Sequence, residues 1–168
     1  YGNLEKFPEH YVFQLNDTHP ILSIPEMMRV LMDENGYGWE EAMAVCRKTF
    51  AFTNHTVMPE ALEKWPCRYI ASVAPRVYMI IEEINRRILQ FMRQSGVSED
   101  KINNCIIIKD GNVNMCQLAI HIAFSINGVA NLHTQILKEQ TFKDLYALYP
   151  SKFNNKTNGI SHRRFLLV

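Results

Sequence analysis

The chain has 168 residues, of which 47% are hydrophobic and 21% are charged, so it is long and apolar enough to bury the core of about one domain. Its 18 basic and 17 acidic residues leave a formal net charge of +1. Because no basic block stands out, nucleic acid and anionic membrane are poor candidates as partners. The longest apolar stretch, residues 118–126, is too short to cross a bilayer.

The first predicted element is a short buried strand at residues 11–15, which is rich in β-forming side chains. A polar turn at residues 16–20 follows its carboxyl end. Ser23 and Glu26 then match a capping box, in which each side chain bonds to the other residue's backbone amide. This box predicts a helix from residue 24 to about residue 33.

The apolar spacing indicates which face of this helix is buried. We expect three of its side chains to point inward: Met27, Val30 and Leu31. Asn35 and Gly36 are typical of a helix end. The apolar spacing resumes on a second helix that starts near Trp39.

The strongest predicted helix covers residues 75–94. Its apolar residues fall on one broad face: Val77, Ile80, Ile81, Ile84, Ile88, Phe91 and Met92. The opposite face carries two glutamates and two arginines at i,i+4 spacing, which are most simply a solvated face. Pro75 suits the first turn of such a helix.

The rest of the chain predicts a helix-rich α/β arrangement with only two or three short strands. The elements expected are a strand at 105–108, a tight turn at 110–111, a deeply buried helix at 115–126, helices at about 131–140 and 142–148, and a polar loop at 153–160. So few strands make a poor sheet by themselves. We therefore interpret the chain as a piece of a larger fold.

The ends of the chain support the same interpretation, and the cysteines indicate the compartment. The chain begins without an initiator methionine, and the apolar run at 165–168 resembles a strand cut from its continuation. Four cysteines are scattered without a C-x-x-C pair: Cys46, Cys67, Cys105 and Cys116. Free thiols and the lack of a signal peptide favour the cytoplasm.

Three polar clusters stand where elements end, which is where α/β proteins place ligands. They cover residues 16–19, 53–56 and 154–159. Their Asn, Asp, Thr and His side chains offer directed donors and acceptors without strong net charge, as sugar hydroxyls require. The alternative is that each cluster forms a turn and bonds to its own backbone. The residues alone leave both interpretations open.

The histidines are ambiguous in the same way. His19 and His55 could bind a metal together with Asp17, but their spacing matches no usual metal motif. His121 lies in an apolar helix and is interpreted as a core histidine with satisfied hydrogen bonds. His133 suits either a helix cap or a site.

Four motifs carry a resemblance to a known family. They are QLNDTHP at 14–20, TNHTVMPEALEKWP at 53–66, NGVANLH at 127–133 and NKTNGI at 155–160. In this order and over essentially the whole chain, they resemble the α-glucan (glycogen or maltodextrin) phosphorylases. Residues 1–168 would then be the latter part of the family's N-terminal domain, running into the interdomain region.

The resemblance implies a fold and a reaction. The fold is the glycosyltransferase-B type, with two Rossmann-like domains, and the enzyme is a cytosolic homodimer. Its partners are an α-1,4-glucan and inorganic phosphate, which together give glucose 1-phosphate. The cofactor is pyridoxal 5'-phosphate, whose attachment lysine motif is not in these 168 residues. The chain by itself is therefore expected to be inactive.

The resemblance also implies which residues of this chain bind the sugar: His55, Asn158, Asp17, His19, Thr56 and Val129. Phe165 is expected near the cofactor, where it replaces the family's tryptophan, and His162 replaces a proline. The alternative is a non-catalytic glucan-binding or assembly protein built from a degenerate phosphorylase segment. A sugar-nucleotide glycosyltransferase lacks support, because the four motifs are specific to phosphorylases.

Overall fold

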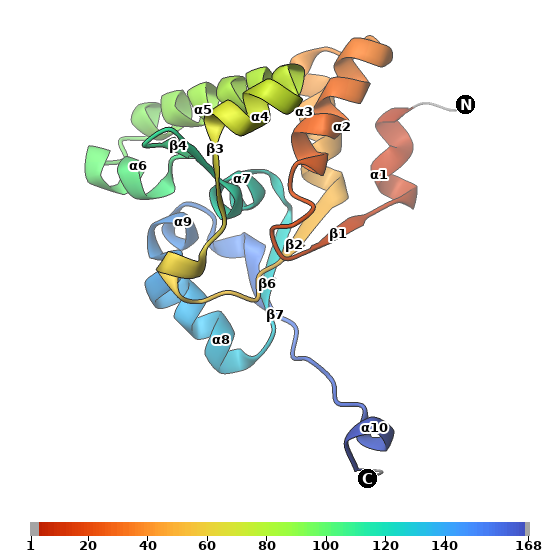
Figure 1. Ribbon diagram of the computed structural model, residues 1–168, viewed down its shortest axis with the longest axis vertical. Helices are drawn as coiled ribbons and strands as arrows, with labels where there is room; N and C mark the ends of the chain where they lie inside the picture. Colours follow the sequence, from red (N-terminus) through yellow and green to blue (C-terminus); the bar gives the residue numbers. More distant parts are fainter. Residues whose placement is uncertain (1–3, 167–168) are drawn as a thin grey trace.

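The structure is a computed structural model that describes residues 4–166. Within that range, a four-stranded parallel sheet forms the centre of the molecule (Figure 1). Its strands, in spatial order, are β1 (Phe13–Asn16), β2 (Phe50–Thr53), β6 (Ser125–Gly128) and β7 (Phe153–Asn155). A smaller antiparallel sheet has the order β3 (Lys64–Pro66), β5 (Asn112–Asn114) and β4 (Ile108–Lys109).

Helical crossovers join the parallel strands, and each one moves the chain along by one strand of the sheet. The first crossover holds α2 (Ser23–Arg29), the π-helical turn η2 (Val30–Glu34) and α3 (Trp39–Thr49). The second holds η3 (Pro59–Ala61), α4 (Cys67–Val73), α5 (Pro75–Gln94), α6 (Glu99–Cys105) and α7 (Met115–Ile122). The third holds α8 (Asn131–Ile136), the π-helical turn η4 (Leu137–Thr141), α9 (Lys143–Leu148) and η5 (Pro150–Lys152).

The remaining helices lie at the two ends of the described chain. They are η1 (Leu4–Lys6), α1 (Phe7–His10) and α10 (His162–Leu166). Figure 1 shows α10 standing apart from the body at the end of an extended stretch. No helix within residues 4–166 has the length and apolar character needed to cross a membrane.

The α/β class is confirmed, but the sheet is larger than the two or three strands that we expected. The central strands are short and fully buried, so the sequence offers no alternation of apolar and polar residues to reveal them. Phe50, Phe52 and Ile126 are each 0% exposed. The predicted strand at 11–15 exists as β1, but it is an edge strand in which only Leu15 is buried.

Helix α5 covers Pro75–Gln94, as the sequence predicts. Six of the seven side chains expected on its apolar face are buried. Phe91 is the exception at 50% exposed. On the opposite face, Glu83 pairs with Arg86 at 2.7 Å and with Arg87 at 2.6 Å, so the solvated charged face is confirmed.

The predicted capping box is wrong. Helix α2 begins at Ser23 after Leu22, which already has helical φ and ψ, so Ser23 is not in the extended conformation that a capping residue needs. The Ser23 hydroxyl donates to the Pro20 carbonyl at 2.5 Å, and the Glu26 carboxylate pairs with Arg29.

The buried face of α2 is also shifted from the expected one. Met28 is fully buried, whereas Met27 and Val30 are only partly covered; Leu31 is buried as predicted. Residues 35–36 end the helical segment as expected, with Gly36 at φ 72.

Three further boundaries differ from the predictions. Cys105 ends α6, and the strand before the tight turn is only Ile108–Lys109. The turn itself is confirmed, because Asp110 (φ 50) and Gly111 (φ 71) both have the positive φ of a type I′ hairpin. The buried helix predicted at 115–126 ends at Ile122, and Ser125–Gly128 is a strand instead.

Near the end of the described chain, two predictions are corrected. The polar loop predicted at 153–160 begins with strand β7 (Phe153–Asn155), whose asparagines gave no β signal. The apolar run at 165–168 was expected to be a strand, but His162–Leu166 is helical. Its last two residues lie outside the described range.

Candidate functional site

A row of polar residues ends the four parallel strands at their carboxyl edge. The register places Asn16, Thr53, Asn127 and Asn154 opposite one another, one on each strand. Thr53 Oγ1 donates to Asn127 Oδ1 at 2.8 Å and accepts from Gln14 Nε2 at 2.8 Å. The loops that follow these residues therefore begin at positions that are held in place by hydrogen bonds between neighbouring strands.

The loop after β1 holds Asp17 and His19. Asp17 has φ 63, and its amide donates to the Thr53 carbonyl at 2.8 Å, which extends the pairing with β2 by one bond. Its Oδ1 accepts from the amide of the next residue, Thr18, at 2.7 Å. Thr18 is buried, and its hydroxyl bonds to the Glu63 carboxylate. His19 is exposed at the outside of this turn.

The loop after β2 holds His55 and Thr56. The Asn54 amide donates to the Asn127 carbonyl at 3.0 Å, and the exposed His55 ring then reaches back to β1, where Nε2 lies 2.6 Å from Asn16 Oδ1. Thr56 is partly buried. The loops that carry His19 and His55 therefore leave two neighbouring parallel strands at the same edge of the sheet.

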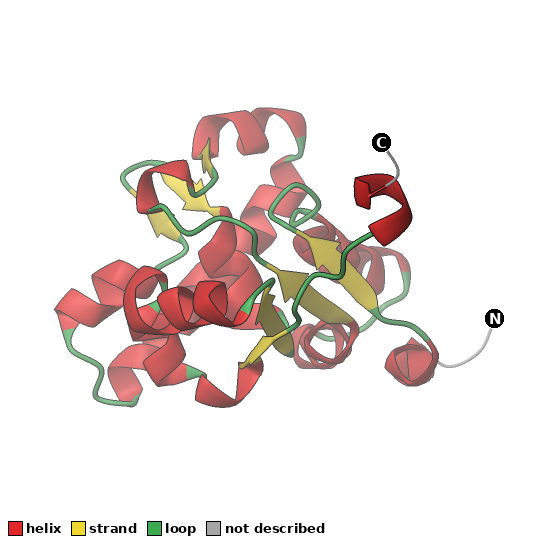
Figure 2. Cartoon of the chain, turned by 90° about the horizontal axis from the view of Figure 1, so that it is seen from below, coloured by secondary structure: helices red, strands yellow, loops and turns green. Residues whose placement is uncertain are grey.

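The loops after β6 and β7 are joined by backbone hydrogen bonds. The Lys156 amide donates to the Gly128 carbonyl at 3.1 Å, and the Asn158 amide donates to the Val129 carbonyl at 2.9 Å. Asn158 is exposed, and Val129 is partly buried. All six residues that the resemblance assigns to sugar binding thus follow neighbouring strands at one edge of the sheet. Figure 2 shows loops crossing in front of the strands at this edge.

Sequence reasoning left the role of His133 open, although it ends the NGVANLH motif. Its Nδ1 accepts from the Val129 amide at 3.0 Å, so the neutral ring carries its proton on Nε2. This Nε2 is buried and has no hydrogen-bond partner within residues 4–166. Burial, and then the neighbouring His55, lower the pKa of His133. Such a donor is one that a ligand or another segment can satisfy.

Replacing Gly128 by alanine should destabilise the protein by about 1–3 kcal/mol, the usual cost of overpacking. A Cβ at this position would lie 2.4 Å from Thr134 Oγ1 and 2.8 Å from His133 Nδ1. Helix α8 can therefore approach β6 only because residue 128 has no side chain. Urea unfolding should show a lower midpoint for Gly128→Ala. Gly159→Ala, which meets nothing within 4 Å, should leave the midpoint unchanged; equal midpoints for both variants would contradict this explanation.

The edge is an open surface rather than a closed pocket, since His19, His55 and Asn158 are all exposed. Within residues 4–166, no group of three or more His, Cys, Asp and Glu side chains is placed to hold a metal ion. The chemistry on offer consists of directed hydrogen-bond donors and acceptors, backbone carbonyls and one carboxylate at Asp17.

Phe165 does not lie at this edge. It is on α10, where its side chain is 64% exposed. Lys152, whose pKa burial lowers, donates to the carbonyls of Ile120 and His121 on α7, and Lys156 Nζ donates to Asn154 Oδ1 at 2.6 Å.

The fold and this edge define an α/β protein with a polar candidate site at the carboxyl ends of its parallel strands. Residues 1–168 match the carbohydrate phosphorylase family, and the chain belongs to that family.

Several characterised relatives are similar over almost the whole chain. The cytosolic alpha-glucan phosphorylase 2 of Arabidopsis thaliana is 50% identical over 96% of this chain and 20% of its own length. The glycogen phosphorylase of Bacillus subtilis is 49% identical over 91% of this chain and 19% of its own length. The muscle glycogen phosphorylase of Ovis aries is 46% identical over 99% of this chain and 20% of its own length. The chain thus spans about a fifth of the length of the relatives that it matches.

Proposed function

We propose that the whole protein is an α-glucan phosphorylase and that this chain supplies part of the wall that binds the reacting glucose. One observation carries the proposal: the motifs that mark the family in the sequence leave four neighbouring parallel strands at the same edge of the sheet. Because the strands are parallel, their carboxyl ends meet at one edge, and the family motifs occupy the loops that leave all four of them there.

The proposed reaction transfers the terminal α-1,4-linked glucose of a glucan to inorganic phosphate. The bond from C1 to the glucan oxygen breaks, a bond from C1 to a phosphate oxygen forms with retention, and glucose 1-phosphate leaves. Positive charge develops on the sugar ring in such a transition state. Carbonyl oxygens and neutral polar groups around the ring stabilise that charge while they take the place of water.

In this reaction the main-chain carbonyl of His55 faces a sugar hydroxyl, and Asn158 bonds the 6-hydroxyl. The hydrogen bond between His55 Nε2 and Asn16 Oδ1 at 2.6 Å supports this assignment, because it holds the loop after β2 in one position relative to β1. The Asn158 amide is likewise fixed to the Val129 carbonyl at 2.9 Å. Groups held in this way lose little entropy when the sugar binds.

Asp17, His19 and Thr56 are proposed to line the same pocket, with Val129 packed near the sugar. Pyridoxal 5'-phosphate is proposed as the cofactor of the whole protein, where its phosphate would pass a proton to the substrate phosphate while the departing glucan oxygen is protonated. Its attachment lysine would have to come from outside this chain, with Phe165 nearby. A cytoplasmic homodimer is proposed as well; the four free cysteines and the name of the Arabidopsis relative support the location.

Asn158→Ala in the whole protein should reduce kcat/KM for phosphorolysis of a maltodextrin by about 1–3 kcal/mol, which is roughly 5- to 150-fold. The variant removes a side chain that bonds a substrate hydroxyl and leaves the backbone bond to Val129 intact. Steady-state kinetics with inorganic phosphate would measure the effect. The control is Asn103→Ala, an exposed asparagine on α6 away from this edge. An unchanged kcat/KM for Asn158→Ala would remove Asn158 from the substrate site.

A further inference from the structure

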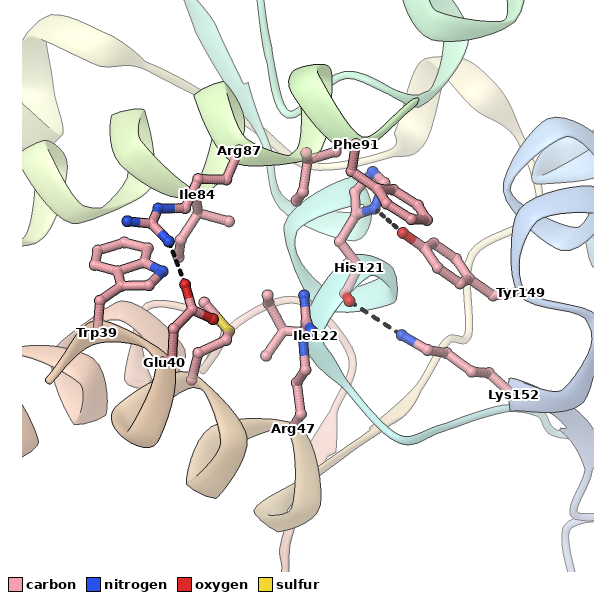
Figure 3. A pocket seen from close by; sticks show the side chains of 12 residues that line it. Trp39, Glu40, Arg47, Ile84, Arg87, Phe91, His121, Ile122, Tyr149 and Lys152 are labelled. Carbon is pink, nitrogen blue, oxygen red and sulfur yellow. Dashed lines mark hydrogen bonds and ion pairs between the residues drawn. The ribbon is translucent and has the colours of Figure 1, made fainter. Parts of the chain in front are cut away.

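A cavity of about 370 Å³ is lined by side chains from α3, α5 and α7 and from the segment before β7 (Figure 3). Helix α3 leads directly into β2, α7 ends shortly before β6, and Lys152 immediately precedes β7. The cavity lies among these three approaches, at the amino-terminal side of the sheet, and α5 forms a further wall. None of the six residues proposed to bind the sugar lines it. Its volume is within the range of about 300–1,000 Å³ that is usual for small-molecule sites.

Three aromatic side chains line this cavity. The Arg87 guanidinium lies 4.7 Å from the centre of the Trp39 ring and pairs with Glu40 and Glu83. Phe91 is half exposed, and Figure 3 shows its ring at the same opening as Tyr149. This explains why the apolar spacing of α5 wrongly placed Phe91 in the core: its ring faces the cavity.

Two further cations line the cavity without a carboxylate partner. Lys152 Nζ donates to the carbonyls of Ile120 (2.9 Å) and His121 (3.0 Å) and lies 4.3 Å from the centre of the Tyr149 ring. Arg47 makes no hydrogen bond or ion pair within residues 4–166. Glu40, the carboxylate in the lining, is already taken by Arg87.

The two cations repel each other. Burial is the main cause that lowers the pKa of Lys152, and the charge of Arg47 adds to it, which brings this pKa to about 8. Lys152 and Arg47 are therefore both still mainly charged at neutral pH. The same two charges also oppose protonation of the buried His121. An anion placed between Arg47 and Lys152 would relieve this repulsion and form charge-assisted hydrogen bonds with both.

We propose that this cavity binds a small phosphate monoester that carries a ring. The phosphate would lie between Arg47 and Lys152, and the ring would pack against the aromatic side chains Phe91 and Tyr149. A planar guanidinium suits phosphate oxygens, and the aromatic lining suits either the face of an aromatic ring or that of a sugar. The site is separate from the proposed glucan wall and does not depend on that function.

The test uses isothermal titration calorimetry on the whole protein with two probes, phenyl phosphate and ribose 5-phosphate. These distinguish an aromatic from a sugar ring, and phenol serves as the uncharged comparison. Arg47→Ala is the main variant, because the exposed Arg47 has no hydrogen bond or ion pair to lose among the described residues. It should weaken binding of the preferred probe at least 10-fold, and Arg47→Glu should abolish binding. Lys48→Ala, which removes the next cation on α3 but none from the cavity, should bind like the unchanged protein.

A second variant tests whether the probe binds at the proposed glucose site instead of in the cavity. Asn158→Ala lies at the other edge of the sheet, so it should leave binding of the preferred probe unchanged. Binding of neither probe at millimolar concentration would overturn the proposal. Equal affinities for the unchanged protein, Arg47→Ala and Arg47→Glu would also overturn it, since the probe would then bind elsewhere. Phenol binding as tightly as phenyl phosphate would likewise contradict a phosphate site.

Discussion

Replacing Phe52 by alanine is expected to lower the free energy of unfolding by about 3–5 kcal/mol, the usual range for a buried phenylalanine. Phe52 is 0% exposed at the centre of β2, where it is in register with Leu15 on β1 and Ile126 on β6. Truncation leaves a cavity that neighbours on both sides cannot fill without distorting the sheet. Urea unfolding followed by circular dichroism would measure the loss.

Phe124 is the matched control for this experiment. It lies just before β6 and is 43% exposed, so Phe124→Ala should cost much less than Phe52→Ala. Similar losses for the two variants would contradict the placement of Phe52 at the centre of the core.

Acidification from pH 7 to pH 4 is expected to remove about 3 kcal/mol of stability through His121 alone. Its ring is 2% exposed, with Nδ1 at 3.0 Å from the Tyr149 hydroxyl and Nε2 at 2.8 Å from the Cys105 carbonyl. Burial lowers the pKa of His121 from 6.5 to about 4, and the nearby charges of Lys152 and Arg47 act in the same direction. The expected core histidine with satisfied hydrogen bonds is thus confirmed.

The sign follows from proton binding. Between pH 6.5 and about 4 the unfolded chain binds a proton at His121, and the folded protein does not, so stability falls as the pH falls. Above pH 6.5 neither state binds this proton, so His121 no longer makes stability depend on pH. In His121→Gln this part of the pH dependence should be absent, even if the variant is less stable overall. The control His10→Gln changes an exposed histidine and should keep it. An unchanged slope in His121→Gln would contradict the assignment.

The long helices could be predicted from the sequence because their signal is repeated many times. Seven apolar positions specify α5, and one wrong member, Phe91, does not change the result. The central sheet could not be predicted in this way. Strands of three or four residues such as β6 and β7 contain no full period of alternation, and their asparagines disfavour a strand. Strand β6 is formed by pairing with β2, and β7 by pairing with β6, which are tertiary effects.

The capping box shows how a local pattern can be overridden. Ser23 and Glu26 have the right types and spacing, but the preceding turn at Leu22 is already helical. The serine hydroxyl therefore bonds back to Pro20, and Glu26 is free to pair with Arg29. Sequence alone cannot distinguish these outcomes, because both satisfy the same side chains.

The candidate site was located from family motifs rather than from physical patterns. Nothing local in the sequence places Asn158 beside Val129 or the His55 ring against Asn16, since those contacts depend on the order of strands in the sheet. Thr53 and Asn127 join the strands beneath the loops; Thr53 was counted only among the candidate ligand residues at 53–56, and Asn127 was part of a quoted motif without a role of its own. Their one signal was position: each ends a short apolar run.

The most direct test of the proposed glucose wall is a crystal structure of the whole protein with a maltooligosaccharide and phosphate bound. We predict that the terminal glucose lies against the carboxyl edge of β1, β2, β6 and β7. The His55 carbonyl and the Asn158 side chain should both be within hydrogen-bonding distance of its hydroxyls. A terminal glucose bound at another face, with these two groups left open to solvent, would contradict the central claim.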